Sequence, residues 1–175
     1  MKSKKFFILM GVCLAFVLMF RMALSAEAAI PKNGSVAVLT KGYSPQYNAS
    51  TASIITRELI ASGYKVVDPA TLDKIRRSKA AAAALNGDVN AIMNLGRQYG
   101  FSTMVTADVE AGNPVINEFK LYTGTASVAV MVTSSGGSQL YADTASGKQV
   151  GYSPDEAAQK SVEATAKLAA TRMVQ

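Results

Sequence analysis

Between residues 88 and 112, a segment with helical periodicity runs directly into a segment with strand periodicity. Ile92, Leu95 and Tyr99 recur at the spacing of one helical face. From residue 101 to residue 109, apolar side chains alternate with more polar neighbours, which is typical of a β-strand. A helix that passes straight onto a strand is the joint of an α/β layer fold, so this segment constrains the architecture of the whole chain.

The first 28 residues have the layout of a signal peptide. Three lysines precede an apolar run over residues 6–20, and the motif Ala-Glu-Ala at 26–28 places small residues at the −3 and −1 positions of a cleavage site. We expect cleavage after Ala28, with Ser25 as the second choice. A retained anchor helix is the alternative, but this run is short for the ~20 residues of a membrane span. The mature protein is therefore expected in the periplasm or outside the cell, without a stable membrane span. Association with the outer membrane is an alternative location.

Charge and cysteine content exclude several classes of protein. Of 18 basic and 12 acidic residues, residues 1–28 hold four and one, which leaves the mature chain at +3. Such a balance argues against nucleic acid as a partner, because nucleic-acid-binding domains are usually strongly basic. The single cysteine, Cys13, lies inside the apolar run and leaves no thiol in the mature chain. Lipidation of Cys13 is an alternative, but Met10-Gly11-Val12 is a poor lead-in for it.

After a lead-in at 29–34, residues 35–175 read as one domain with the element order β-α-β-α-α-β-β-β-α. The strands joined by helices should be parallel, and the last three should form an antiparallel meander. We therefore predict a mixed α/β fold, with one sheet covered by helices in a three-layer-like arrangement and a helix at the C-terminus. The expected elements are strands at 35–40, 64–67, 101–109, 118–134 and 139–150 and helices at 50–62, 69–84, 89–99 and 154–174.

Local patterns add detail to these elements. The helix at 50–62 should bury Ile60 with Ala52, Ile55 and Leu59, and residues 41–48 read as a polar loop. In the long strand, the apolar phase changes at Gly124, which suggests a bulge or bend there. Asp68, Asp88 and Ser153 read as helix N-caps, the last within a capping box with Glu156. The last helix has an inner stripe of small residues in which Val162 and Leu168 are the bulky members.

No residue set specifies a reaction. The chain has no histidine, which removes the commonest general base and zinc ligand. Ser62 and Lys65 match a Ser-x-x-Lys string, but the other motifs of that enzyme class are missing. Asp108 and Glu110 should share one face of a strand and are weak candidates for a hard-cation site, with a solvated strand end as the plainer interpretation. We expect no cofactor.

Two surfaces are candidates for contact with other molecules. Lys74, Arg76 and Arg77 belong to a basic helix segment that could meet acidic polymers or headgroups, although such runs are usually only solvated faces. Tyr43 and Tyr47 lie in the predicted loop at 41–48, and tyrosine is favoured at interfaces.

The element order and several phrases resemble the CsgG-like group of periplasmic α/β domains. This group includes the N-terminal domain of TolB-like proteins and the middle domain of FlgT. The phrases are SVAVLT, IITRELIASGYKVVDPATLDKI, LGRQYGFSTMVTADVE and SPDEAAQKSVEATAKLA.

The resemblance implies a non-enzymatic envelope domain that acts in assembly, secretion or scaffolding. A curli channel would carry a lipidated cysteine directly after its signal and long membrane hairpins, and this chain has neither feature in its sequence. Pore formation is therefore not expected. The resulting hypothesis is a protein-interaction domain whose partners are other envelope proteins or a second copy of the chain. The alternative is a periplasmic small-molecule or cation-binding module.

Overall fold

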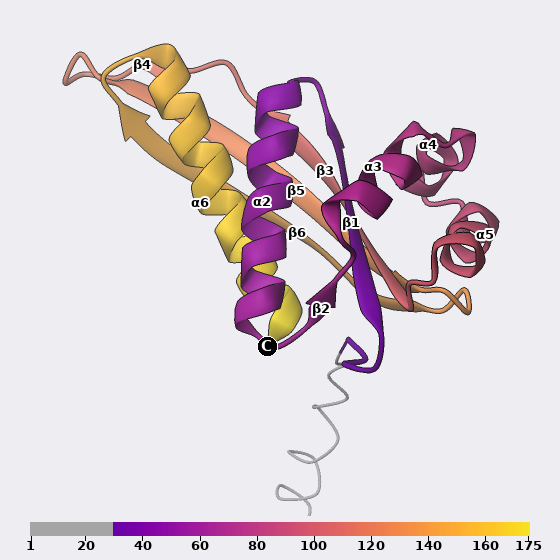
Figure 1. The fold of residues 1–175 in the computed structure, drawn as a ribbon. Coiled ribbons are helices and arrows are strands. Elements are labelled where there is room, and N and C mark those ends of the chain that lie inside the picture. Colours follow the sequence, from indigo (N-terminus) through magenta and orange to yellow (C-terminus); the bar gives the residue numbers. More distant parts are fainter. Residues whose placement is uncertain (1–29) are drawn as a thin grey trace, which may run out of the picture.

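The chain folds around a six-stranded mixed sheet (Figure 1). The computed structural model describes residues 30–175, so the predicted signal peptide lies outside the described residues. The strand order is β2 (Lys65–Val66), β1 (Ser35–Gly42), β3 (Thr103–Ala111), β5 (Tyr122–Ser134) and β6 (Gln139–Gly151), with β4 (Val115–Ile116) paired to the start of β5. β1 is parallel to β2 and β3, whereas β5 is antiparallel to β3, β4 and β6. The predicted arrangement of parallel and antiparallel strands is confirmed, with β4 as an additional short strand.

Helices cover both faces of the sheet. α2 (Pro45–Ala61) and α6 (Pro154–Val174) lie side by side on one face, and α3 (Pro69–Arg77), α4 (Lys79–Leu85) and α5 (Val89–Tyr99) pack against the other (Figure 1). In β1, Val36 and Val38 belong to the core under α2 and α6, whereas Ala37 and Leu39 belong to the core under α3–α5. This burial on both sides explains why β1 is almost continuously apolar. The mixed α/β class is thus confirmed.

α6 lies close against the sheet because glycines face it. A Cβ atom at Gly124 or Gly151 would collide with backbone atoms of Ala157. The predicted stripe of small residues is buried for the most part, but Leu168 is partly exposed. Met173, which the periodicity did not single out, is buried instead and joins the core shared with α2.

The loop predicted at residues 41–48 is shorter than expected. β1 continues to Gly42, and α2 begins at Pro45, whose fixed φ suits the first helical turn. Tyr47 therefore lies in α2, half-buried against the core, while Tyr43 stays in the connection and is fully exposed.

The helix predicted at 69–84 is in fact two helices. α3 ends at Arg77, Ser78 has an extended backbone, and α4 begins at Lys79. The backbone N–H and the hydroxyl of Ser78 both donate to the carbonyl of Ile75, over 3.0 and 2.7 Å, and close the last turn of α3. A continuous alanine run conceals this break, because alanine favours a helix on either side of it.

The strand predicted to begin at residue 118 begins at Tyr122. Phe119 lies in a tight turn before the strand, so it takes no part in the strand alternation. From Gly124 onward, one alternating set of side chains is buried without a change of phase. The register with β6 shifts between Val132 and Thr133, so the bend predicted at Gly124 is wrong.

The predicted helix caps are confirmed, with one change of partner. Asp68 and Asp88 accept hydrogen bonds from backbone N–H groups in the first turns of α3 and α5. Ser153 Oγ accepts from the N–H of Glu156 over 3.2 Å. The Glu156 carboxylate accepts from the N–H of Tyr152 over 2.7 Å, one residue before the donor that the capping box predicts.

Ile60, which the helical periodicity predicts to be buried, is 58% exposed. α2 turns its Ile55 and Leu59 side toward the sheet, with Ile54 also buried. Because consecutive residues are about 100° apart around a helix, Ile60 falls outside the stripe that Leu59 occupies.

Candidate functional site

Exposed apolar side chains gather at one end of the sheet, where β4, β5 and β6 meet. We call this end the distal tip. Among the described residues it holds five of the nine large apolar side chains that are exposed: Val115, Ile116, Phe119, Val150 and Tyr152. The strand register sets Val115, Thr123 and Val150 side by side in one row. In Figure 1 the distal tip lies beside the label β4, at the opposite end of the molecule from the C-terminus.

The turn at the distal tip is held by one side chain. Asn117 Oδ1 accepts hydrogen bonds from the N–H groups of Phe119 and Leu121, at 3.0 and 3.1 Å. The backbone of Asn117 also bonds to Leu121 and Lys120, at 2.8 and 3.0 Å. Lys120 has a φ of 59°, the left-handed conformation that this tight turn requires. Phe119 is consequently 74% exposed on a turn with a fixed backbone.

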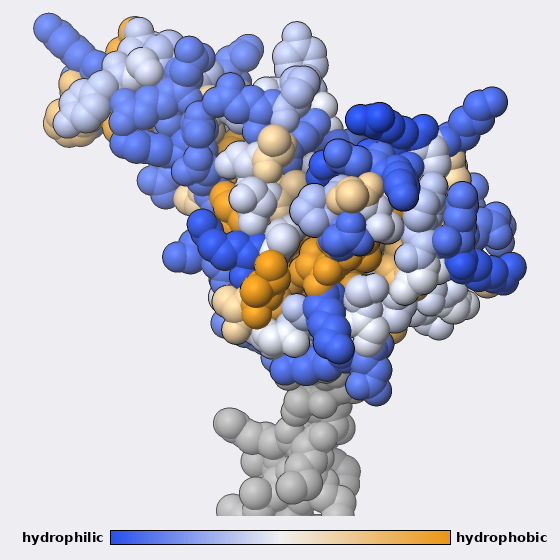
Figure 2. Space-filling model, viewed as in Figure 1, coloured by the Kyte–Doolittle hydropathy of each residue, from blue (hydrophilic) through white to orange (hydrophobic). Residues whose placement is uncertain are grey.

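A groove of about 480 Å³ lies between α2 and α3. Figure 2 shows an apolar area on this face of the molecule, between the two helices. α3 contributes Arg76 to the groove, and α2 contributes Ala49, Ala52, Ser53, Thr56, Arg57 and Ile60. We call this feature the α2–α3 groove.

A second hollow, of about 520 Å³, lies on the other side of α2, against α6. It shares Ser53 and Arg57 with the α2–α3 groove, and α6 adds Lys160, Glu163 and Lys167. Lys160 forms an ion pair with Glu156 at 2.6 Å, and its hydrogen bond lowers the pKa of the Glu156 carboxyl. Together the two hollows are lined by four basic residues and one acidic residue, so this face favours anionic groups.

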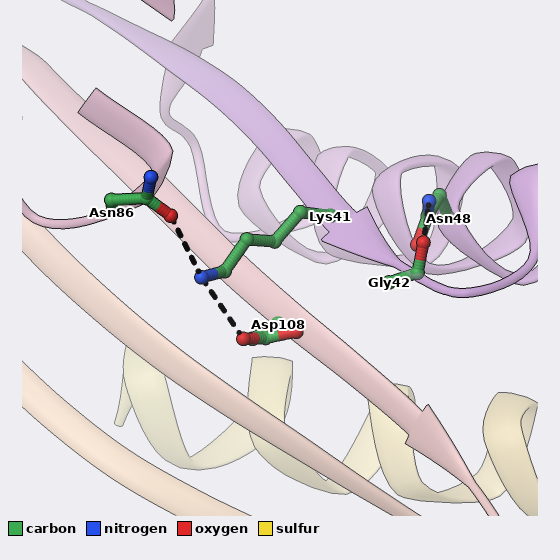
Figure 3. Close-up of polar contacts among 5 residues, drawn as sticks. All are labelled: Lys41, Gly42, Asn48, Asn86 and Asp108. Atoms are coloured by element: carbon green, nitrogen blue, oxygen red, sulfur yellow. Dashed lines mark hydrogen bonds and ion pairs between the residues drawn. The ribbon is translucent and has the colours of Figure 1, made fainter. Parts of the chain in front are cut away.

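A polar cluster lies at the carboxyl ends of the parallel strands β1 and β3 (Figure 3). Lys41 Nζ is 3.1 Å from a carboxylate oxygen of Asp108 and 3.3 Å from the side-chain oxygen of Asn86. Nearby, Asn48 Nδ2 donates to the carbonyl of Gly42 over 3.2 Å and ties the start of α2 to the end of β1. The ammonium of Lys41 thus lies beside the carboxylate of Asp108, one of the two candidate cation ligands.

The remaining predicted site residues lie on separate surfaces. Asp108 and Glu110 share one face of β3, as their spacing predicts, but the described residues include no group of three or more acidic, histidine or cysteine side chains able to hold a metal ion. Lys74, Arg76 and Arg77 are exposed on α3, and only Arg76 lines the α2–α3 groove. Arg76 also forms a surface ion pair with Asp73 at 3.6 Å.

Sequence reasoning missed the distal tip and the groove for the same reason. It assigned Phe119 to a strand and Ile60 to a core, so neither side chain was recognised as exposed. A signal for the tip was present in Asn117, because asparagine commonly bonds to the backbone two residues further on and starts a turn.

Comparison with solved structures identifies proteins that share this fold. The lipoprotein GNA1162 from Neisseria meningitidis has a TM-score of 0.55 and 17% identity, over 69% of this chain and 85% of its own. The hypothetical protein CT253 from Chlamydia trachomatis has a TM-score of 0.52 and 17% identity, over 81% and 93%. Identities this low establish a shared mixed α/β fold alone. No curated protein matches the chain as a relative.

The chain belongs to the family of the TP0693-like lipoprotein C-terminal domain, which matches residues 41–174. Lipoproteins are proteins of the cell envelope, so this membership indicates an envelope location. Within residues 30–175, no helix is both long and apolar enough to cross a bilayer. The family shown is not the CsgG-like group, and the resemblance to CsgG-like, TolB-like and FlgT domains stays a prediction.

Proposed function

We propose that this chain is a non-enzymatic interaction domain that binds another envelope protein during secretion or envelope assembly. The observation that carries the proposal is the distal tip, with Phe119 74% and Tyr152 81% exposed. Leaving apolar surface in water costs about 25 cal/mol per Å². Exposed apolar side chains gathered in this way at one end of a sheet typically mark a surface that another molecule covers.

The fixed turn supports the same proposal. Because Asn117 already holds the backbone on both sides of Phe119, a partner would lose little conformational entropy in ordering it. Aromatic side chains on a rigid backbone are the usual anchors of protein interfaces. A second copy of the chain is one partner that can bind this surface.

Two further sets of residues are proposed as contact surfaces of lesser extent. Tyr43 is fully exposed between β1 and α2, and Tyr47 follows it in the first turn of the helix. Lys74, Arg76 and Arg77 form the exposed basic side of α3. Both sets lie on the surface, where a protein partner or an acidic envelope polymer can reach them.

The alternative function is a cation-binding module that uses Asp108 and Glu110. It draws support from their position on one face of β3. A bound cation would have to compete with Lys41, whose ammonium lies 3.1 Å from Asp108. A rise in melting temperature on adding calcium, lost in Asp108→Asn, would favour this alternative over the interaction domain.

The proposed location is the periplasm or the extracellular side, after removal of residues 1–28. The proposal accordingly assigns the apolar leader to targeting and the domain at 35–175 to binding.

The test is site-specific cross-linking from the distal tip in living cells of the native host. A photoreactive residue at position 119 should link to one envelope protein, or to a second copy, and that protein should then bind the purified chain. The double variant Val115→Ser/Phe119→Ser should weaken this binding roughly 100-fold, because two exposed anchors are lost. Val89→Ser, an exposed valine on α5, is the matched control and should leave binding unchanged. Equal loss in both variants, or no cross-link from position 119, would contradict the proposal.

A further inference from the structure

The α2–α3 groove combines an apolar floor with a basic wall on either side. The residues that α2 contributes follow the spacing i, i+3, i+4, i+7, i+8 and i+11. They form a row of roughly three helical turns, about 16 Å long. The groove is therefore elongated along α2.

The floor of the groove is shaped for a closely approaching partner. Ala49, Ala52 and Ser53 are small, so an incoming element can lie near the backbone of α2. Ile60 closes one end of the row and is 58% exposed. Covering this isoleucine with another apolar group would be favourable, because it would remove apolar surface from water.

The charges of the groove are unbalanced. Its lining residues include Arg57 and Arg76 and no acidic side chain. Within the described part of the chain, Arg57 makes no ion pair, and the pair of Arg76 with Asp73 is long, at 3.6 Å. Guanidinium groups bind carboxylates through two parallel hydrogen bonds, which favours carboxylates as their partners.

We infer that the α2–α3 groove binds an acidic amphipathic helix of a partner protein. The helix would place apolar side chains at i, i+3, i+4 and i+7 on the row formed by Ala52, Thr56 and Ile60. Aspartate or glutamate side chains at its flanks would meet Arg57 on one side and Arg76 on the other. The inference rests on the proposed function only in taking a protein as the partner, and it concerns a surface other than the distal tip.

An acidic helix explains the observations together better than a lipid surface does. A bilayer would need a protruding apolar surface, whereas the apolar residues here line a concave groove. In the second hollow, Lys167 adds positive charge beyond Arg57, whereas Lys160 is already paired with Glu156.

The test uses the protein purified after export from a bacterial host and a stapled helical peptide of 14 residues as the probe. The peptide carries leucine at i, i+3, i+4 and i+7 and glutamate at the flanking positions. Binding is followed by amide chemical shifts in NMR spectra and by titration calorimetry. We expect shifts confined to residues 49–60 and to α3, and we expect no binding of the same peptide with lysine in place of glutamate.

Matched variants decide whether the groove is responsible. Arg57→Glu and Arg76→Glu should each weaken binding roughly 10-fold, as expected for loss of one charge-assisted contact. Arg97→Glu makes the same change of charge on α5, at an exposed position outside the groove, and should leave binding almost unchanged. Ile60→Ser should also weaken binding, whereas Leu168→Ser, on α6, should not.

Several results would overturn the inference. These are no binding of the acidic peptide, equal binding of the lysine peptide, or equal weakening by Arg97→Glu and Arg57→Glu. Binding to phosphatidylglycerol vesicles that the arginine variants abolish, without peptide binding, would assign the groove to lipid. Self-association that Ile60→Ser abolishes would assign it to a second copy. Variants of the distal tip should leave peptide binding intact, so the inference and the proposed function can fail separately.

Discussion

The carbonyl oxygen of Ala157 lies so close to Gly124 that a Cβ atom at this glycine would overlap it. The contact joins the first turn of α6 to the start of β5. Only hydrogen at position 124 leaves room for the helix at this distance, so the residue is required for close approach of helix and sheet.

Gly124→Ala should therefore destabilise the fold. The added methyl group must displace backbone atoms of α6, and overpacking of this kind costs about 1–3 kcal/mol of unfolding free energy. Urea unfolding followed by circular dichroism measures the change. Gly136→Ala is the matched control, because the nearest atom to its added Cβ is at 3.6 Å and belongs to a side chain. Equal stabilities of the two variants would contradict the packing described for α6.

Asn117→Ala should loosen the distal tip without unfolding the protein. The substitution removes the oxygen that accepts from the N–H groups of Phe119 and Leu121. Amide hydrogen exchange should become at least several-fold faster at these two positions, and unfolding free energy should fall by about 1 kcal/mol. Exchange in β3, measured in the same sample, should not change. If Phe119 exchanges at the same rate in both proteins, the turn is held by something else.

The ion pair between Asp143 and Arg172 predicts a pH-dependent contribution to stability. Arg172 donates to Asp143 over 3.2 Å, and this bond, with one from the hydroxyl of Tyr141, lowers the pKa of the Asp143 carboxyl. A carboxyl whose pKa is lower in the folded state stabilises the fold above its ordinary pKa. That stabilisation is lost as pH falls through the lowered pKa.

Asp143→Asn should accordingly lower stability at pH 7 and have a smaller effect in strong acid. Because both side chains are partly exposed, we expect at most about 1 kcal/mol. Urea unfolding of both proteins across the acidic range measures the difference. A difference that stays constant from neutral to strongly acid pH would show that the charge of Asp143 does not stabilise the fold.

Mass spectrometry of the exported protein tests the predicted cleavage. A mass that begins at Ala29 is expected, since the small residues at 26 and 28 suit the protease. Substituting Ala28 by arginine should block or move the cleavage. A mature chain that begins with a lipidated Cys13 would instead show that the leader is a lipoprotein signal, in keeping with the lipoprotein family of the domain.

The order of helices and strands could be predicted because local patterns determine it. The alternation through β3 and the caps Asp68, Asp88 and Ser153 each depend on residues a few positions apart. The predictions were wrong where a tertiary contact determines which side chain is buried. Whether Ile60 or Ile54 is buried depends on how α2 is rotated against the sheet, which its own periodicity leaves open.

The candidate surfaces were harder to predict than the fold. Phe119 and Tyr152 are more than 30 positions apart and reach the same end of the sheet only through the pairing of β5 with β6. Arg57 and Arg76 likewise line one groove although α2 and α3 lie on opposite faces of the sheet, which no local pattern indicates. The basic side of α3 was recognisable from sequence, but which of its cations faces a groove depends on an element elsewhere in the chain.

The pairing of α2 with α6 has a consequence for how the polypeptide acquires its shape. Gln46 in the first turn of α2 bonds to Gln159 of α6, and α6 packs on β5 and β6 beside α2, which packs on β1. During synthesis, β5 and β6 emerge before the helix that covers them. Until that helix arrives, the valines of β5 that it will cover remain accessible to water, so a chaperone or rapid docking of α6 must protect the nascent molecule from aggregation.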